Sequence, residues 1–199
     1  MDLIQIQKII PIITDTSLRI LEYQKQQVFD KNMIINCVYG DIKNGLIQLH
    51  PNIPMICKDK EYHPYAERKL WKDYWLLNPL SHITNFIMGK NDFTIQLTYI
   101  KNNYPINSII VYPALKKLYY TSSTSAYQVM FDRNFLGGLT EIKVSDCAWP
   151  IKIVIPKKGL NENTKYVLDK IQNNVSCEAI LIENNDNLIS LLSSHSNFL

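Results

Sequence analysis

The 199-residue sequence predicts an α+β fold, with a helical N-terminal part packed on a mainly antiparallel β-sheet and helices near the C-terminus. Apolar residues recur mostly at helical spacing in residues 1–89, whereas from Asn91 they alternate with polar residues, as in strands. Helices first and antiparallel strands later are typical of the α+β class. The length suits a single domain over residues 1–199, with a possible subdivision into a helix-rich part, 1–89, and a β-rich part, 90–199.

The first predicted helix begins at residues 15–17, Asp-Thr-Ser, a favourable N-cap cluster, and continues to about Phe29. Before it, the apolar stretch 3–13 is interrupted by Pro11. Because proline removes a backbone donor and fixes φ, this stretch is predicted to be either a short helix or an extended arm.

A β-hairpin is expected next. Residues 33–39 predict a strand, residues 40–45 contain turn-forming glycines and asparagine, and residues 46–49 could return as the second strand. Two helices are then predicted, one over residues 64–75 with Pro64 in its first turn, and one over 80–88 that ends at a glycine.

The second half of the chain is predicted to be rich in strands. The expected strands are 93–99, 106–112, 127–131, 139–144 and 151–155. A helix over 162–172, a late strand over 178–182 and a terminal amphipathic turn or helix over 188–192 complete the pattern.

Composition excludes several classes of function. The net charge of +3 and pI near 8.5 permit a polyanionic partner without requiring one. The sequence has no glycine-rich nucleotide motif and no Gly-x-Ser-x-Gly. It also has neither a signal-peptide pattern nor an apolar run of roughly 20 residues, so a cytoplasmic protein without a membrane segment is expected. Its residue usage is typical of an AT-rich genome, and the host cytoplasm is expected if the protein is viral.

One catalytic arrangement is suggested by Asp132 with Glu141 and Lys143. Glu and Lys two residues apart on a strand project from the same face, and the Gly137-Gly138 turn could bring Asp132 beside them. Two carboxylates could then hold Mg²⁺ while the lysine acts on the phosphate or the attacking water. This pattern resembles that of the restriction-endonuclease-like nucleases. The alternative is a solvated strand face with a salt bridge.

Cysteine and histidine chemistry has weaker support. A zinc site could use His50, Cys57 and His63 with Cys37, but the paired spacing of common zinc motifs is absent. Nucleophilic catalysis could use Cys37 with His50 or His82, yet Cys37 falls in an apolar stretch predicted to be a buried strand. The alternative is that these are loop histidines and buried, reduced thiols.

A binding surface could be formed by Lys116, Lys117, Tyr119 and Tyr120. Tyrosines stack on bases and lysines neutralise phosphates, so the stretch could contact single-stranded nucleic acid or a protein. The alternative is an edge strand whose lysines prevent unwanted strand pairing.

Taken together, the sequence favours a non-catalytic interaction or accessory protein without a cofactor, viral or phage-encoded in one interpretation. Its expected partner is a protein, a second copy of the chain, or a nucleic acid. The alternative is a metal-dependent nuclease that uses Asp132, Glu141 and Lys143 with Mg²⁺. The sequence does not decide whether the protein is an enzyme.

Overall fold

The computed structural model describes most of the chain. The described residues are 3–27, 30–60, 63–122, 124–143, 151–156, 161–175 and 177–182. The chain forms two compact units, Met1–Glu141 and Ile142–Leu199. Whether these units together form the single domain predicted over residues 1–199 stays a prediction.

The first unit begins with the long helix α1, Leu3–Lys25, which contains Pro11. The prediction that a helix starts at residues 15–17 is wrong. Thr16 and Ser17 instead donate their hydroxyls to the carbonyls of Ile12 and Ile13, one turn back, at 2.8 and 2.7 Å. Such internal bonds satisfy hydroxyls within a helix, so residues that favour an N-cap lie here in a continuous helix.

Helix α2, Lys31–Leu49, occupies the region predicted to be a hairpin, so that prediction is also wrong. The side chain of Asp30 caps the helix by accepting from the Met33 N–H at 2.9 Å. The buried residues of α2 follow helical spacing and face the core: Ile34, Ile35, Val38, Ile42 and Leu46. Gly45 marks a close approach to α1 rather than a turn, because a Cβ at this position would lie 2.7 Å from the Ile12 side chain.

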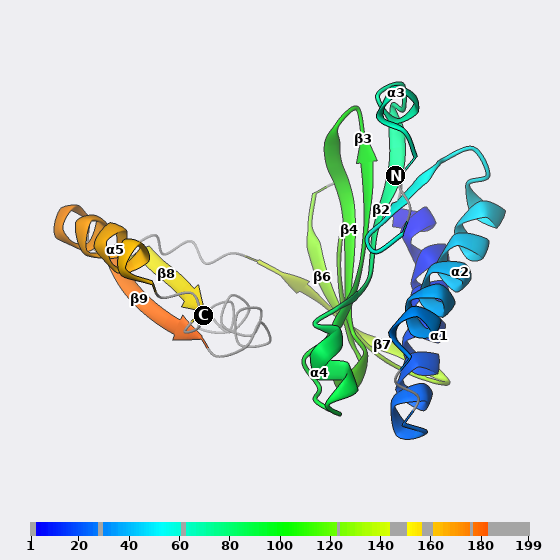
Figure 1. Cartoon of the computed structure of the whole chain (residues 1–199), viewed down its shortest axis with the longest axis horizontal. Helices are drawn as coiled ribbons and strands as arrows, with labels where there is room; N and C mark the ends of the chain where they lie inside the picture. Colours follow the sequence, from blue (N-terminus) through cyan, green and yellow to red (C-terminus); the bar gives the residue numbers. More distant parts are fainter. Residues whose placement is uncertain are drawn as a thin grey trace. The chain divides into compact units, whose positions relative to one another are not determined.

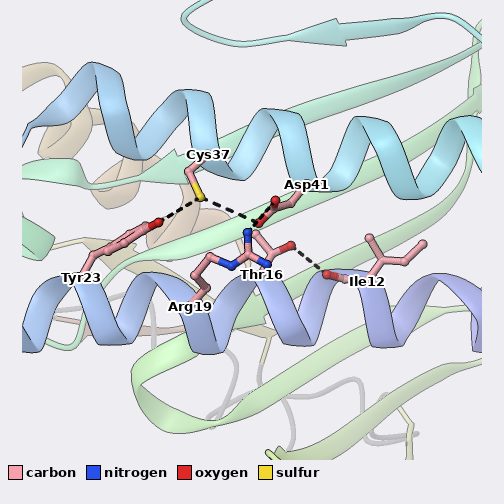
Figure 2. A network of polar contacts seen from close by, with 6 residues as sticks. All are labelled: Ile12, Thr16, Arg19, Tyr23, Cys37 and Asp41. Atoms are coloured by element: carbon pink, nitrogen blue, oxygen red, sulfur yellow. Dashed lines mark hydrogen bonds and ion pairs between the residues drawn. The ribbon is translucent and has the colours of Figure 1, made fainter.

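A polar network joins α1 to α2 (Figure 2). Arg19 on α1 forms an ion pair with Asp41 on α2 at 2.8 Å, and Asp41 raises the pKa of Arg19. The Cys37 Sγ lies 3.8 Å from both Tyr23 Oη and Asp41 Oδ2, and its contact with Tyr23 raises the pKa of the phenol. Cys37 is therefore a half-buried helix residue in a contact between helices, and the prediction that it lies in a buried strand is wrong.

The seven-stranded sheet has its strands in sequence order. They are β1 Met55–Cys57, β2 Asp73–Ser81, β3 Thr94–Lys101, β4 Tyr104–Tyr112, β5 Lys117–Thr121, β6 Ala126–Asp132 and β7 Phe135–Ile142. The β1–β2 pair is parallel, whereas β2 to β6 pair antiparallel with one another. The predicted α+β class with a mainly antiparallel sheet is confirmed.

Three short helical segments connect the strands: α3 Tyr65–Arg68, α4 Ile83–Ile87 and the 3₁₀ turn η1 Pro113–Leu115. The helix predicted over 64–75 ends early. Trp75 and Leu77 belong to β2, where both are buried while Leu76 between them is exposed. Helix α4 matches only the second part of the prediction over 80–88, and Gly89 follows it with φ +69°.

The hydrophobic core of the first unit lies between one face of the sheet and the two long helices. Figure 1 shows α1 and α2 on the same side of the sheet. The helices contribute mainly isoleucines, such as Ile13 and Ile42, and the strands contribute alternate residues, such as Leu77 and Leu97. This packing fixes β1 and β2 against α2, which positions both regions described below.

The second unit contains a parallel pair, β8 Ile151–Pro156 and β9 Cys177–Ile182, joined through helix α5, Glu162–Asn174. The strands and helix predicted over 151–155, 162–172 and 178–182 match these elements within two residues at each end. The predicted terminal helix over 188–192 lies outside the described residues. Among the described helices, none is both long and apolar enough to cross a membrane.

Candidate functional site

The carboxyl ends of the parallel strands β1 and β2 form the first candidate region. Ligands of sheets with parallel strands commonly bind at such ends. Beyond the last residue of β1, the Lys58 N–H donates to the Leu77 carbonyl at 2.9 Å, which places Lys58 just before the register shift of β2 at Asn78. Lys58 is exposed, so its ammonium group is accessible to an anion.

Polar residues gather where β2 ends. The β2–β3 register shifts between Asn78 and Ser81, and Ser81 Oγ lies 2.5 Å from Thr94 Oγ1 in a buried contact. The Asn78 Oδ1 is buried and has no hydrogen-bond partner among the described residues. His82 follows with φ +52°, a left-handed conformation that costs energy for a residue other than glycine. A bulge, an unpaired acceptor and a strained residue at one strand end are typical of a functional site.

The start of α2 lies beside the loop after β1. Lys31, the first residue of α2, lies 3.9 Å from Asp59 in the loop after β1, and the Lys60 ammonium hydrogen-bonds the Asn36 side chain. The partial positive charge of the α2 N-terminus is already met by the Asp30 carboxylate that caps it, so Lys58 is the group of this region that favours an anion. We call Lys58, Asn78, Ser81, His82 and Thr94 the strand-end site.

The donors of the strand-end site suit an anion better than a metal ion. Mg²⁺ is held mainly by carboxylate oxygens, whereas this site offers hydroxyls, an amide, an imidazole and an ammonium group. Among the described residues, no three Asp, Glu, His or Cys side chains converge as metal ligands. The described residues therefore do not fit the divalent cation that many phosphatases use.

The structure does not assemble the zinc site considered from sequence, since no metal-ligand cluster forms within the described part of the chain. Cys57 is 3% exposed, and burial raises the pKa of its thiol to about 11. Its Sγ lies 3.2 Å from the Lys58 carbonyl oxygen. Cys57 is thus a protonated core thiol. Burial and Lys8 lower the pKa of His50, whose ring lies beside the Trp75 ring with centroids 6.0 Å apart.

Two residues of the predicted nuclease site, Asp132 and Glu141, hydrogen-bond to different partners. Asp132 ends β6 and accepts hydrogen bonds from Lys116 Nζ at 2.6 Å and from the Arg133 N–H at 2.8 Å. The bond from Lys116 lowers the pKa of the Asp132 carboxyl. Glu141 lies on β7 and accepts from Ser125 Oγ at 2.7 Å.

The turn expected to bring Asp132 and Glu141 together is also misplaced. Gly137 and Gly138 lie inside β7, and the turn between β6 and β7 falls at residues 133–134. Lys143 belongs to the second compact unit. The prediction of a Gly-Gly turn is therefore wrong.

The predicted binding surface is divided between two faces of β5. Tyr120 is 4% exposed and stacks on Tyr127 with ring centroids 5.2 Å apart, so its ring is unavailable to a base. Lys117 and Tyr119 alternate with it along β5, and Lys116 pairs with Asp132. These residues do not form one continuous surface.

Comparison with known proteins identifies related enzymes. No family model matches the sequence. The 3'(2'),5'-bisphosphate nucleotidase CysQ of Haemophilus influenzae is 27% identical over 138 residues, 69% of this chain and 49% of the relative. That of Aggregatibacter actinomycetemcomitans is 32% identical over 126 residues, 63% and 46% respectively. The chain thus spans about half the length of the curated relatives it matches.

A solved structure shows the fold. The crystal structure of CysQ from Bacteroides thetaiotaomicron, a bacterial member of the inositol monophosphatase family, superposes with a TM-score of 0.70 at 16% identity. The match covers 95% of this chain and 76% of that chain. The fold is that of the inositol monophosphatases.

These comparisons correct the functional interpretation of the sequence. The relatives are named as nucleotidases, which are enzymes, and neither as accessory proteins nor as nucleases. The prediction of a non-catalytic interaction protein and its nuclease alternative are therefore both wrong. Protein binding, nucleic-acid binding and a viral or phage origin have no support in these relatives.

Sequence reasoning missed the strand-end site. Asn78 fell between two predicted helices, 64–75 and 80–88, and Ser81 and His82 fell inside the second, so their place at the end of a strand was hidden. The missed signal was the short continuous apolar run of residues 74–77, followed by Asn78 and Pro79, which is consistent with a buried strand.

Proposed function

We propose that the protein acts on 3'(2'),5'-bisphosphate nucleotides, the substrate class in the names of its curated relatives, and that the strand-end site binds one of the phosphates. The similarity to these nucleotidases, which covers about two thirds of the chain, carries the proposal. Because the chain spans about half of each relative, phosphate binding is proposed for the described residues and hydrolysis for the whole protein.

Electrostatics support phosphate binding at this place. A phosphate monoester is a strong hydrogen-bond acceptor with up to two negative charges. Lys58 offers a charge-assisted hydrogen bond. Ser81 and Thr94 contribute hydroxyls at the end of β2. A mostly neutral and cationic site can attract a phosphate directly, without a bridging metal.

Hydrolysis asks for more than binding. The attacking water must be activated and charge on the phosphoryl oxygens neutralised, which phosphatases commonly achieve with metal ions. The described residues do not fit such an ion, so the roles supported for them are to bind and orient the phosphate.

Titration calorimetry of the purified chain with adenosine 3',5'-bisphosphate tests the proposal. We expect saturable binding that weakens with salt, weaker binding of adenosine 5'-monophosphate, and no binding of unphosphorylated adenosine. Equal binding of adenosine would overturn the phosphate assignment, because it would show that the base alone is recognised.

Phosphate release is measured on the same complexes with added Mg²⁺. Release of one phosphate per nucleotide supports hydrolysis. A saturated complex that releases none contradicts hydrolysis by this chain and leaves the binding result intact.

Two further expectations accompany this proposal. We propose a cytoplasmic location, in keeping with the lack of a membrane-spanning helix among the described residues. A protein partner, self-association or nucleic-acid binding stays a prediction from the sequence.

A further inference from the structure

A cavity of about 450 Å³ opens at the other end of the parallel strand pair, beside the first residues of β1 and β2. The second half of α2, the loop at residues 51–54 and the region around α3 form its walls. Its volume lies within the range of small-molecule sites. The side chains that give it its chemistry are Tyr39, Lys43, His63, Trp71 and Trp75.

Trp75 lines the cavity and carries a buried hydrogen-bond donor without a partner in the described part of the chain. The side chain is 2% exposed, and its Nε1 has no hydrogen-bond partner among the described residues. Its ring packs against Tyr99, with centroids 5.1 Å apart. An unpaired buried donor is unfavourable, but the Nε1 atom is itself buried, so an acceptor atom of a ligand would reach it only after a small shift of the indole ring.

The walls combine aromatic rings with positive charge. The ammonium groups of Lys43 and Lys60 each lie 5.2 Å from the centre of the Tyr39 ring. Among the described residues, neither lysine has a carboxylate partner in an ion pair. Of the two, Lys43 lines the cavity, and its charge favours a negatively charged ligand next to Tyr39.

The acidic residue of the wall is already engaged. Glu67 Oε1 lies 3.3 Å from His63 Nδ1, and the His63 ring meets the Trp71 ring edge-on with centroids 5.0 Å apart. Glu67 therefore offsets the lysines only in part, and the histidine and tryptophan rings add a flat apolar wall.

We propose that this cavity binds a small planar heteroaromatic anion. The ring would pack among Tyr39, Trp71 and Trp75, a small shift of the Trp75 indole would bring its N–H to an acceptor in the ring, and the anionic group would lie near Lys43. The site is separate from the strand-end site and does not depend on the proposed function, because its residues stand at the start of β2 rather than at its end.

Nicotinate and its uncharged amide, nicotinamide, form a matched pair of probes for the intact chain. The indole N–H signal of Trp75 is assigned in a ¹H–¹⁵N spectrum by its loss in Trp75→Phe. We expect nicotinate to shift this signal saturably and nicotinamide to bind at least about tenfold more weakly, equivalent to the loss of one charge-assisted contact.

Lys43→Gln tests the charge without disturbing the core, because Lys43 lies on the half-exposed side of α2. We expect it to weaken nicotinate binding about tenfold, whereas the control Lys90→Gln leaves binding unchanged. The proposal is overturned if about 10 mM nicotinate, enough to occupy a millimolar site, does not move the Trp75 signal. Equal binding of both probes would also overturn it.

Discussion

The two ends of the parallel β1–β2 pair differ in what they contribute to the protein. At the start of β2, Trp75 is buried among aromatic rings beside a cavity. At its end, Asn78 and Ser81 sit at a bulge next to Lys58. The large apolar residue stabilises the fold, whereas the small polar residues form few apolar contacts and suit a charged ligand. The same two strands therefore have a large buried apolar residue at one end and small polar residues at the other.

Replacing Trp75 with alanine tests the stabilising end most strongly. Loss of a fully buried Trp is expected to lower the free energy of unfolding by about 3–5 kcal/mol. Urea unfolding followed by circular dichroism measures this loss. Trp71→Ala, at a less buried ring of the same cavity, serves as the control and should cost clearly less. Equal losses would show that Trp75 is not the anchor.

Alkaline pH tests the buried thiol of Cys57, the last residue of β1. Folding raises the pKa of Cys57 from 9.0 to about 11, because burial disfavours the thiolate. A raised folded pKa means that stability is complete below about pH 9 and is lost as the pH rises towards 11. This loss is at most about 2–3 kcal/mol.

Urea unfolding of the wild type and Cys57→Ala between about pH 8 and pH 10.5 measures this effect. The wild type should lose stability more steeply than the variant, which has no thiol at this position. Parallel pH profiles would contradict the assignment.

Lys58→Gln tests the charged end. Removing one charge-assisted contact is expected to weaken binding of adenosine 3',5'-bisphosphate about tenfold, or about 1.4 kcal/mol. The free energy of unfolding should change by less than about 0.5 kcal/mol, since Lys58 is exposed. Lys101→Gln, at the far end of β3, is the matched control for calorimetry. The site is misassigned if both variants bind like the wild type.

Ser81→Ala has the smallest expected effect. It removes the buried contact with Thr94 and should lower the free energy of unfolding by about 1 kcal/mol. Ser108→Ala removes a comparable contact with Thr98, at 3.1 Å and half-buried, and should cost less. The reverse order in urea unfolding would mean that the bulge does not depend on this hydroxyl pair.

The sequence predicted the strands better than the helices because the two leave different local signals. In β3, Ile95, Leu97 and Tyr99 alternate with polar residues, and this pattern alone indicates a strand with one buried face. In α2, Ile34 and Ile35 looked like strand residues, whereas Gly45 looked like a turn residue. Packing against α1 stabilises the helical conformation of this region, and such packing depends on residues far away in the sequence.

The candidate site was harder to predict for a related reason. Asn78 and Ser81 acquire a role only because β1 pairs in parallel with β2 and places Lys58 beside them. No short sequence motif indicates that the two strands pair in parallel. Asp132 and Glu141, in contrast, matched a local pattern but hydrogen-bond to Lys116 and Ser125, respectively. The spacing of residues along the sequence was therefore a poorer guide to the site than the pairing of the strands.

A ¹H–¹⁵N NMR titration with adenosine 3',5'-bisphosphate tests the central claim most directly, because it monitors both ends of β2 in one experiment. We predict saturable shifts of the Lys58, Ser81 and His82 amide signals and an unchanged Trp75 indole signal. Shifts confined to the Trp75 indole, or no shifts at saturating nucleotide, would contradict phosphate binding at the strand-end site.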